Sequence, residues 1–442
     1  MLTAAIGKAL ISHICRKASC TLPSIEYLGF RGLLKALGTE CSQIYVPKLE
    51  RNYVVNVNGI KVKISPLSRE QEGIIKEISY YPSIRKLSFN RAMYENEIES
   101  YMRDVVKALK TIVRRYSLKE EGESLVSFIP WRHNKYVVMG RYIKVFYMPP
   151  LGVHSLKSNV EKVPLKTILG NNISGSSFSI SIRNTHEIHI SYKGYEWIFH
   201  IRGSIRKVLG NENRGYVLIK LSNSKNHVLL TPSMELYMLC DGFQVETDHE
   251  GGLLTWFTLF TVLEEKIGYN EDFDVYGPLW FDYASLDHGI GVCTKGKVHA
   301  KISGCKILFS EGRGLTVKIH RGSWEEGGVG SSCIQSMVAL KKVKMGLKKS
   351  ITLIELVPKH VIPLGIRVRN NVITLELFNL STKPILSRIR IPWKIENAYK
   401  VSILSERILD DISYDYNIIY LPLTANEYAK LKIRISPIII LR

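Results

Sequence analysis

Two aspartates, a histidine and two aromatic residues lie close together in the stretch PLWFDYASLDHGIGVCTKGK, residues 278–297. Carboxylates and an imidazole beside Trp or Tyr rings are the side chains from which sugar-cleaving and metal-binding sites are built. Asp and Ser before Gly are equally typical of a turn. The pattern favours a turn that leads into a strand over a catalytic site. A sugar-contacting rim is the alternative, with the candidates Trp280, Asp282, Tyr283, Asp287 and His288.

Three other stretches contain side chains suited to a metal or a sugar. HEIH (186–189) has two histidines three positions apart, which point to opposite faces of a strand and therefore cannot share a metal ion. NEDFDVYG (270–277) has too few carboxylates for a dedicated calcium loop. RGSWEEGG (321–328) places Trp324 in a glycine-rich loop, which makes it a further candidate for stacking on a sugar ring. We assign no catalytic residue and no metal ligand from these patterns.

The composition is that of a globular protein with a large excess of positive charge. Its 442 residues are 45% hydrophobic and 23% charged, which suits a chain of several domains. The formal net charge is +21, but the Lys and Arg residues are scattered along the chain. The densest run, KKVKMGLKK (341–349), has no interleaved aromatic residues of the kind that stack on bases. We therefore do not expect nucleic acid as a partner.

The cysteines and the apolar segments indicate in which cellular compartment the protein is expected. The seven cysteines have irregular spacing without a CxxC pair, which indicates neither a disulfide framework nor a zinc site, so a reducing cytoplasm fits best. Lys8 interrupts the apolar N-terminal stretch, so we expect no signal peptide. No run of about 18 apolar residues suggests a membrane span.

The first 120 residues are predicted to be mostly helical, with a helix over 24–38 and a small hairpin over 53–64 around Asn58 and Gly59. The strongest helix follows, and its apolar stripe needs a partner helix, so a small bundle is expected. The stripe consists of Ile98, Tyr101, Met102, Val105, Val106, Leu109, Ile112, Val113 and Tyr116.

After Gly122 the pattern becomes one of short alternating strands without intervening helices, which is typical of antiparallel sandwiches. The clearest alternation is in FSISIRNTHEIHISYKGYEWIFHI (178–201). A Lys-rich loop near 345–350 precedes the last group of strands. The sequence therefore predicts a mainly β protein with an N-terminal α part, divided into residues 1–120, 121–345 and 346–442.

Four separated stretches resemble, in order, the rear half of the glycoside hydrolase family 38 α-mannosidases. In EGESLVSFIPWRHNKYVVMG (121–140), Pro130, Trp131 and Arg132 match a motif that follows the helical bundle in the family. The Asn of that motif is absent here. YMPPLGVHSL (147–156) matches the Pro-Pro-Leu-Gly exit from a strand. The stretch 278–297 matches at Trp280, Asp282, Ser285 and Gly289, and VITLELFNLSTKPILSRIRIPWKIENAYKVSILSE (372–406) resembles the closing β-domain.

The resemblance implies a fold and an activity. The implied fold is a helical bundle from about residue 80, then a galactose-mutarotase-like β-supersandwich and a smaller C-terminal β-sandwich. The family's retaining chemistry needs a carboxylate nucleophile, an acid and a divalent metal, usually zinc, in a preceding α/β domain. Here Pro82, Ser83 and Ile84 keep the turn that opens the bundle, but Ile78 and Ser79 stand near where the family's last His-Asp metal ligand would be.

Because most of an α/β domain has no room before the bundle, we expect no catalytic residue and no zinc in this chain. Zinc is expected only in a complete family member or in a separately encoded catalytic chain. The first functional hypothesis is a non-catalytic subunit, or a degenerate homologue, in mannose metabolism. The second is a stand-alone carbohydrate-binding protein. The third, a polyanion-binding protein, would lose affinity steeply with salt.

Overall fold

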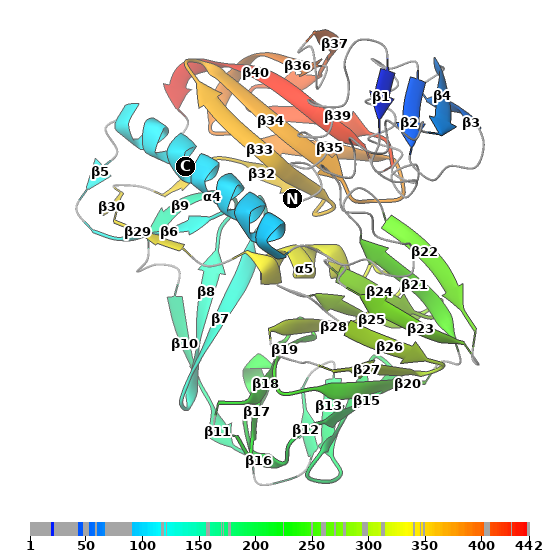
Figure 1. The fold of residues 1–442 in the computed structure, drawn as a ribbon. Coiled ribbons are helices and arrows are strands. Elements are labelled where there is room, and N and C mark those ends of the chain that lie inside the picture. The colour runs from blue at the N-terminus through cyan, green and yellow to red at the C-terminus, as the bar shows by residue number, and fades with distance from the viewer. Residues whose placement is uncertain are drawn as a thin grey trace.

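A computed structural model describes residues 19–21, 43–46, 53–57, 60–66 and 91–439, apart from short gaps. The gaps after residue 91 are 116–118, 121, 156–159, 169, 171, 176–177, 224, 249–250, 258–261, 269–270, 277–279, 294–298, 311–313, 339–340, 345, 348–349, 402–406 and 426. The helix predicted over 24–38 and the turn at 82–84 lie outside the described residues. Within the described part the chain is mainly β, as the alternating pattern predicts (Figure 1).

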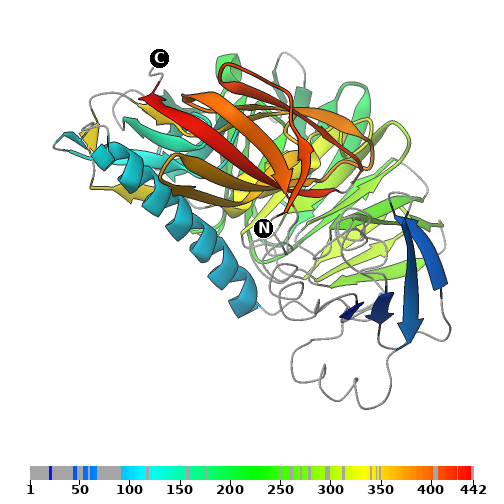
Figure 2. The same cartoon turned by 90° about the horizontal axis from the view of Figure 1, so that it is seen from above.

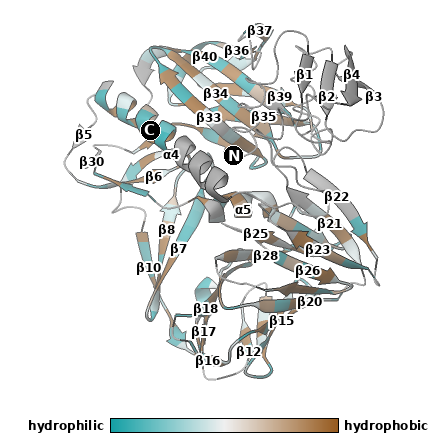
Figure 3. Cartoon of the chain, viewed as in Figure 1, coloured by the Kyte–Doolittle hydropathy of each residue, from teal (hydrophilic) through white to brown (hydrophobic). Residues whose placement is uncertain are grey.

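Two large antiparallel sheets form the middle of the chain and enclose one hydrophobic core between them. Apolar residues alternate along their strands, so one face of each sheet turns inward (Figure 3). The first sheet has the order β11 (Lys166–Thr167), β16 (Ile205–Asn211), β17 (Tyr216–Leu221), β18 (His227–Leu230), β19 (Glu235–Leu239), β28 (Leu315–Arg321), β25 (His288–Cys293), β24 (Trp280–Ala284), β21 (Gly252–Phe257), β22 (Val262–Ile267). The second has the order β12 (Asn172–Ser174), β13 (Phe178–Ile182), β14 (Glu187–Tyr192), β15 (Tyr195–Ile201), β20 (Phe243–Thr247), β27 (Lys306–Phe309), β26 (His299–Ser303), β23 (Asp272–Tyr276).

Smaller sheets cover the first large sheet and connect it to the rest of the chain. Ile143 and Val145 pack against Leu209, Leu218 and Leu229 of the large sheet, and a 3-10 helix over Glu212–Arg214 joins β16 to β17. The covering sheet has the order β10 (Val160–Pro164), β8 (Tyr142–Met148), β7 (His133–Met139). The connecting sheets are β29 (Lys341–Val343), β6 (Ser124–Ser127), β9 (Gly152–Ser155), β31 (Ile351–Thr352), and the pair β30 (Gly346–Leu347), β5 (Lys119–Glu120).

The last part of the chain forms a second, smaller pair of antiparallel sheets with its own hydrophobic core. One has the order β32 (Glu355–Val357), β35 (Ile385–Arg390), β39 (Ile418–Leu423), β38 (Tyr414–Asp415). The other has the order β33 (Val361–Arg369), β34 (Val372–Asn379), β40 (Tyr428–Ile439), β36 (Trp393–Val401), β37 (Ile408–Asp411). The boundaries predicted near 121 and 346 stay predictions. β30 and β31 follow residue 345 but pair with β5 and β9, so strands on the two sides of the boundary near 346 share sheets.

The amphipathic helix is present as α4 (Arg91–Arg115), and its apolar stripe packs on a sheet. Val105, Leu109 and Ile112 are buried in the core of the C-terminal sheets, and the helix runs along β33 (Figures 1 and 2). A sheet face therefore covers the stripe for which a partner helix was expected. The rest of the expected bundle lies outside the described residues.

The described parts of residues 1–66 are strands, although this region was predicted to be mostly helical. The predicted hairpin is confirmed, because β3 (Tyr53–Val57) pairs antiparallel with β4 (Ile60–Pro66). β1 (Ser19–Thr21) and β2 (Gln43–Val46) add to it in parallel. Parallel neighbours need a long crossover, and the segments between them lie outside the described residues.

A disulfide corrects one reading of the cysteines. Cys293 at the end of β25 is bonded to Cys333 on α5 (Val329–Met337), and both are buried. Sequence spacing could not predict this bond, because α5 reaches β25 only through tertiary packing. A single disulfide is not a framework, but it is unusual in a reducing compartment, and the cytoplasmic location stays a prediction. Within the described ranges, no helix is long and apolar enough to cross a membrane.

Candidate functional site

The stretch 278–297 forms the antiparallel hairpin β24–β25, with the predicted turn between its strands. Ser285 closes the turn: its backbone N–H donates to the His288 carbonyl at 2.9 Å, and its Oγ accepts from the N–H groups of Asp287 and His288 at 3.3 Å. This is the local side chain to backbone bonding expected of Ser in a turn. Asp287 is exposed, and so is Leu286 beside it.

Both faces of β24 are buried, which decides where the candidate residues lie. Phe281 and Tyr283 point into the core between the two large sheets, and the Tyr283 hydroxyl donates to the Gly304 carbonyl at 2.8 Å. Trp280 belongs to the other core, where its ring lies 5.1 Å from that of Trp324. Packing therefore accounts for these aromatic rings without a ligand, and their contact with a sugar stays a prediction.

Asp282 and His320 form a fully buried pair beside Trp280. Nε2 of His320 lies 2.7 Å from Oδ1 of Asp282, and both side chains are only 1% exposed. Nδ1 of His320 is buried and has no hydrogen-bond partner among the described residues. Such a pair can satisfy a buried polar face of the sheet, but it is closed to a substrate.

His288 is held between two polar partners and two aromatic rings. Its Nδ1 lies 3.0 Å from Ser285 Oγ, and its Nε2 is hydrogen-bonded to the Asp248 carboxylate. The ring stacks on Tyr195 at 4.1 Å. Serine, histidine and aspartate together suggest a nucleophilic triad. Here, however, Ser285 Oγ also accepts the two backbone bonds of the turn, so the arrangement holds the hairpin.

The glycine-rich loop of Trp324 attaches the large sheets to the C-terminal sheets. Glu325 accepts hydrogen bonds from the Thr382 N–H at 2.7 Å and from the Thr382 hydroxyl at 2.9 Å. Gly327 passes so close to His320 that an added Cβ would lie 2.4 Å from its ring, which explains why this position has no side chain. The loop is therefore a link between cores, with Trp324 buried inside it.

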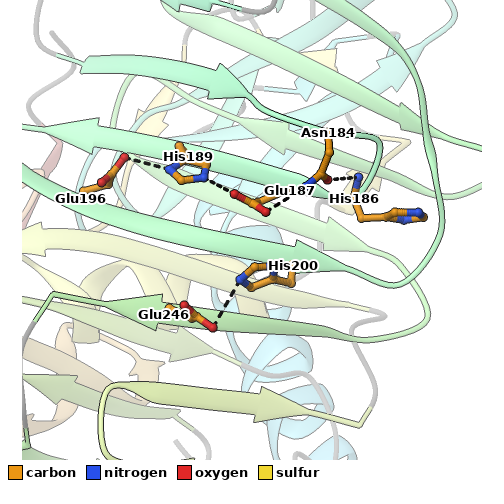
Figure 4. Close-up of polar contacts among 7 residues, drawn as sticks. All are labelled: Asn184, His186, Glu187, His189, Glu196, His200 and Glu246. Atoms are coloured by element: carbon orange, nitrogen blue, oxygen red, sulfur yellow. Dashed lines mark hydrogen bonds and ion pairs between the residues drawn. The ribbon is translucent and has the colours of Figure 1, made fainter.

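The two histidines of HEIH lie apart (Figure 4). His189 is on β14, whereas His186 lies in the bend before this strand, so the strand period does not apply to the pair. His186 is exposed and contacts the Gly203 carbonyl, whereas His189 is buried between Glu187 and Glu196. The hydrogen bond from His189, followed by that from Asn184, lowers the pKa of Glu187. In the part of the chain that the structure covers, no group of three or more His, Cys, Asp and Glu is placed to hold a metal ion, so no donor set fits zinc.

A cavity of about 650 Å³ is lined by residues of β7, β8 and β9 on one side and of β31, β32 and β35 on the other. A volume in this range suits a small ligand. Three of the four stretches that carry the family resemblance, although far apart in sequence, bring residues to its wall. The lining residues are Arg132, His133, Asn134, Tyr147, Met148, Pro149, Pro150, His154, Ser350, Ile351, Thr352, Glu355, Arg390, Ile391, Pro392 and Asn417.

Two buried histidines in this wall are held neutral. His133 Nδ1 lies 3.0 Å from the Trp131 carbonyl, and His154 Nε2 lies 3.0 Å from the Pro150 carbonyl. Because a carbonyl only accepts, each of these nitrogens carries the proton, and the second nitrogen of each ring is an acceptor. Burial, followed by the charge of Lys135, lowers the pKa of His133 to about 3. Burial lowers the pKa of His154 to about 4.

The rest of the wall supplies hydrogen-bond donors and apolar surface. Arg390 Nη1 donates to Glu355 Oε2 at 3.1 Å, which fixes both side chains at the rim. Asn417 Nδ2 donates to the Ile391 carbonyl at 3.0 Å. Tyr147 is partly exposed and hydrogen-bonded to Glu161, and that bond is the main reason why the pKa of Tyr147 rises to about 12. Donors, acceptors and a ring together suit a ligand with several hydroxyl groups.

Acidification is expected to destabilise the fold through His133 and His154. Because the pKa of each is lower in the folded chain than the ordinary 6.5, the unfolded state binds more protons, and stability falls as the pH falls from 6.5 towards 4. The loss approaches roughly 1.4 kcal/mol per pH unit for each group below pH 6.5, so lowering the pH from 7 to 5.5 should cost about 2.5 kcal/mol through these two groups. Urea unfolding at the two pH values measures the change in free energy.

A variant and a control locate this effect. His154→Gln removes one of the rings whose pKa is lowered by burial and should reduce the pH-dependent loss by about 1 kcal/mol. His186→Gln changes an exposed histidine and should leave the loss as it is in the unmodified chain. An unchanged loss in His154→Gln would mean that other groups control the acid sensitivity.

Sequence reasoning did not select His133, His154, Glu355 or Arg390 as site residues. A signal was present, because Arg132 and the Pro-Pro pair stand in the motifs that carry the resemblance. Those motifs were interpreted as structural, and each is too short to show that another stretch lies opposite. The expected candidates around Trp280 and the cavity thus lie in different parts of the structure.

Comparisons with known proteins find a partial similarity among solved structures. A protein of glycosyl hydrolase family 38 from Enterococcus faecalis matches with a TM-score of 0.40 and 7% identity, over 72% of this chain and 53% of that one. This chain therefore spans about half the length of that protein. The chondroitin AC lyase of Streptomyces coelicolor A3, in complex with chondroitin sulphate, gives a TM-score of 0.16 and 7% identity, over 58% and 37%. No family model and no curated protein matches the sequence.

Proposed function

We propose that this chain is a non-catalytic, carbohydrate-binding relative of the family 38 α-mannosidases, acting in mannose metabolism. In this proposal the large sheets are the galactose-mutarotase-like supersandwich and the last sheets are the C-terminal β-sandwich. The observation that supports it is the convergence of Arg132, Pro149, Pro150 and Arg390, from three stretches that resemble the family, on one cavity. A sugar would bind there through its hydroxyl groups.

The mode of binding follows from the wall. Each sugar hydroxyl both donates and accepts a hydrogen bond, and the wall offers both, with Asn417 and Arg390 as donors and the neutral His133 as an acceptor. Tyr147 and the prolines offer apolar surface to the C–H faces of a ring. No residue of this chain is given a bond-breaking role.

Mannose binding tests the carbohydrate part of the proposal. Isothermal titration with α-mannobiose is expected to give saturable binding, and Arg390→Ala should weaken it about tenfold or more, because a hydrogen bond to a charged group contributes about 1.5–3 kcal/mol. Arg206→Ala, an exposed arginine on β16 away from the cavity, is the matched control and should bind normally. Equal affinity in both variants would place the sugar elsewhere.

A separately encoded α/β chain would complete the enzyme. Native mass spectrometry of the chain isolated from its host is expected to show a second chain, and the pair should cleave an aryl α-mannoside with zinc while this chain alone does not. If the chain arrives alone at about its own mass of 50.3 kDa, the subunit role fails and stand-alone carbohydrate binding is left.

A further inference from the structure

The charges around the cavity are unequal. Among its lining residues Arg132 and Arg390 carry positive charge, and Glu355 carries the negative charge. The two histidines are neutral near pH 7, because burial holds the pKa of each far below its ordinary value. Lys135 and Lys359 add positive charge close enough to lower the pKa of His133 further. The lining side chains therefore carry a net charge of +1, two arginines against one glutamate, on a chain whose net charge is +21. Glu161, which is hydrogen-bonded to Tyr147, adds negative charge beside the wall.

The two arginines differ in how much of their hydrogen-bonding capacity is used. Of the five N–H donors of its guanidinium, Arg390 uses one in a hydrogen bond to a described side chain, that of Glu355. Arg132 is exposed and has no ion pair or hydrogen bond with any residue that the structure describes. A planar guanidinium offers two parallel N–H donors that match the geometry of a carboxylate, phosphate or sulfate. Arg132 thus presents an unused anion-binding group to the cavity.

We infer that the sugar bound in this cavity carries a negatively charged group, which Arg132 holds while His133 and Asn417 contact its hydroxyls. The inference rests on the proposed carbohydrate-binding function and adds the class of its ligand. Arg390 is held in place by Glu355 and contributes the second positive charge. A neutral sugar would leave the Arg132 guanidinium without a counter-charge, whereas an acidic sugar uses it.

Matched pairs of sugars test the inference by isothermal titration. The pairs are mannose with mannose 6-phosphate, glucose with glucuronate, and N-acetylglucosamine with its 6-sulfate, and inorganic phosphate is titrated alone. In at least one pair the charged member is expected to bind about tenfold or more tightly than the neutral one. Raising the salt concentration from 50 to 300 mM should reduce this preference, because an exposed ion pair is screened.

Arg132→Gln tests whether Arg132 is the residue that causes the preference for the charged sugar. It removes the charge of an exposed side chain, so the fold should persist, and the charged and neutral members should then bind within about twofold of each other. Arg206→Gln, at an exposed position on β16, should keep the preference. Arg132→Lys keeps the charge but loses the planar pair of donors and should restore only part of it.

The outcomes separate the inference from the proposed function. Equal binding of charged and neutral members by the unmodified chain overturns the inference and leaves carbohydrate binding standing. If inorganic phosphate binds as tightly as the sugar phosphate, the site takes an adventitious ion only, and the inference fails. If none of the six sugars and no α-mannobiose binds, the proposed function itself fails.

Discussion

Replacing Asp282 by alanine is expected to lower the free energy of unfolding by about 3–5 kcal/mol, the usual cost of removing one partner of a buried ionisable pair. Asp282 accepts the hydrogen bond from His320 at 2.7 Å, and both side chains are fully covered. Nδ1 of His320 already lacks a partner among the described residues. Without Asp282, neither ring nitrogen of His320 would have a hydrogen-bond partner among the described residues, and the buried imidazole could not reach water.

Two further variants test whether the loss comes from the buried hydrogen bond of Asp282, with unfolding followed in urea. Asp282→Asn keeps the size of the side chain and an acceptor oxygen, so its loss should be clearly smaller than that of Asp282→Ala. Asp287→Ala removes an exposed carboxylate in the same hairpin and should change stability by less than about 0.5 kcal/mol. Equal effects of the two alanine variants would contradict the burial of Asp282.

Trp280→Ala is expected to lower the free energy of unfolding by a similar amount, about 3–5 kcal/mol, because truncating a buried tryptophan removes apolar contact and leaves a cavity. Trp280 packs on Trp324 and lies in the core that includes α5 and the C-terminal sheets. The expected loss therefore affects the attachment of two parts of the chain. Urea unfolding followed by circular dichroism measures it.

The control for this variant is an exposed hydrophobic residue. Leu386 on β35 is 62% exposed, and Leu386→Ala should change stability by less than about 0.5 kcal/mol. If Trp280→Ala unfolds like the unmodified chain and instead loses affinity for a sugar, Trp280 lies at an accessible rim, and the packing argument is wrong.

Helices, hairpins and turns that are determined by neighbouring residues could be predicted from the sequence. The helix over 91–115, the hairpin around 58–59 and the turn after Ala284 all have signals within a few residues, and the structure contains each of them. The antiparallel, mainly β character follows in the same way from alternation with short turns. The period fixes which residues share a face of a strand.

Which faces of the strands are buried under another layer was decided only by the tertiary structure. In β24 the alternation separates Phe281 and Tyr283 from Trp280 and Asp282, which suggests one buried face and one open face. The structure buries both, because α5 and the Trp324 loop lie over the second face. The candidate sugar-contacting residues Trp280 and Asp282 lie on this second face, which α5 and the Trp324 loop cover.

The cavity could not be predicted from the sequence for the same reason. Arg132, His154 and Arg390 carry no common periodic signal, since they come from separate strands and loops that meet only after the sheets have packed. The disulfide between Cys293 and Cys333 likewise depends on α5 reaching β25. The sequence by itself determined the strands, the turns and the amphipathic helix, since these depend on neighbouring residues. Tertiary structure decided which faces are covered and which charges share a cavity, since these depend on contacts between residues far apart in the chain.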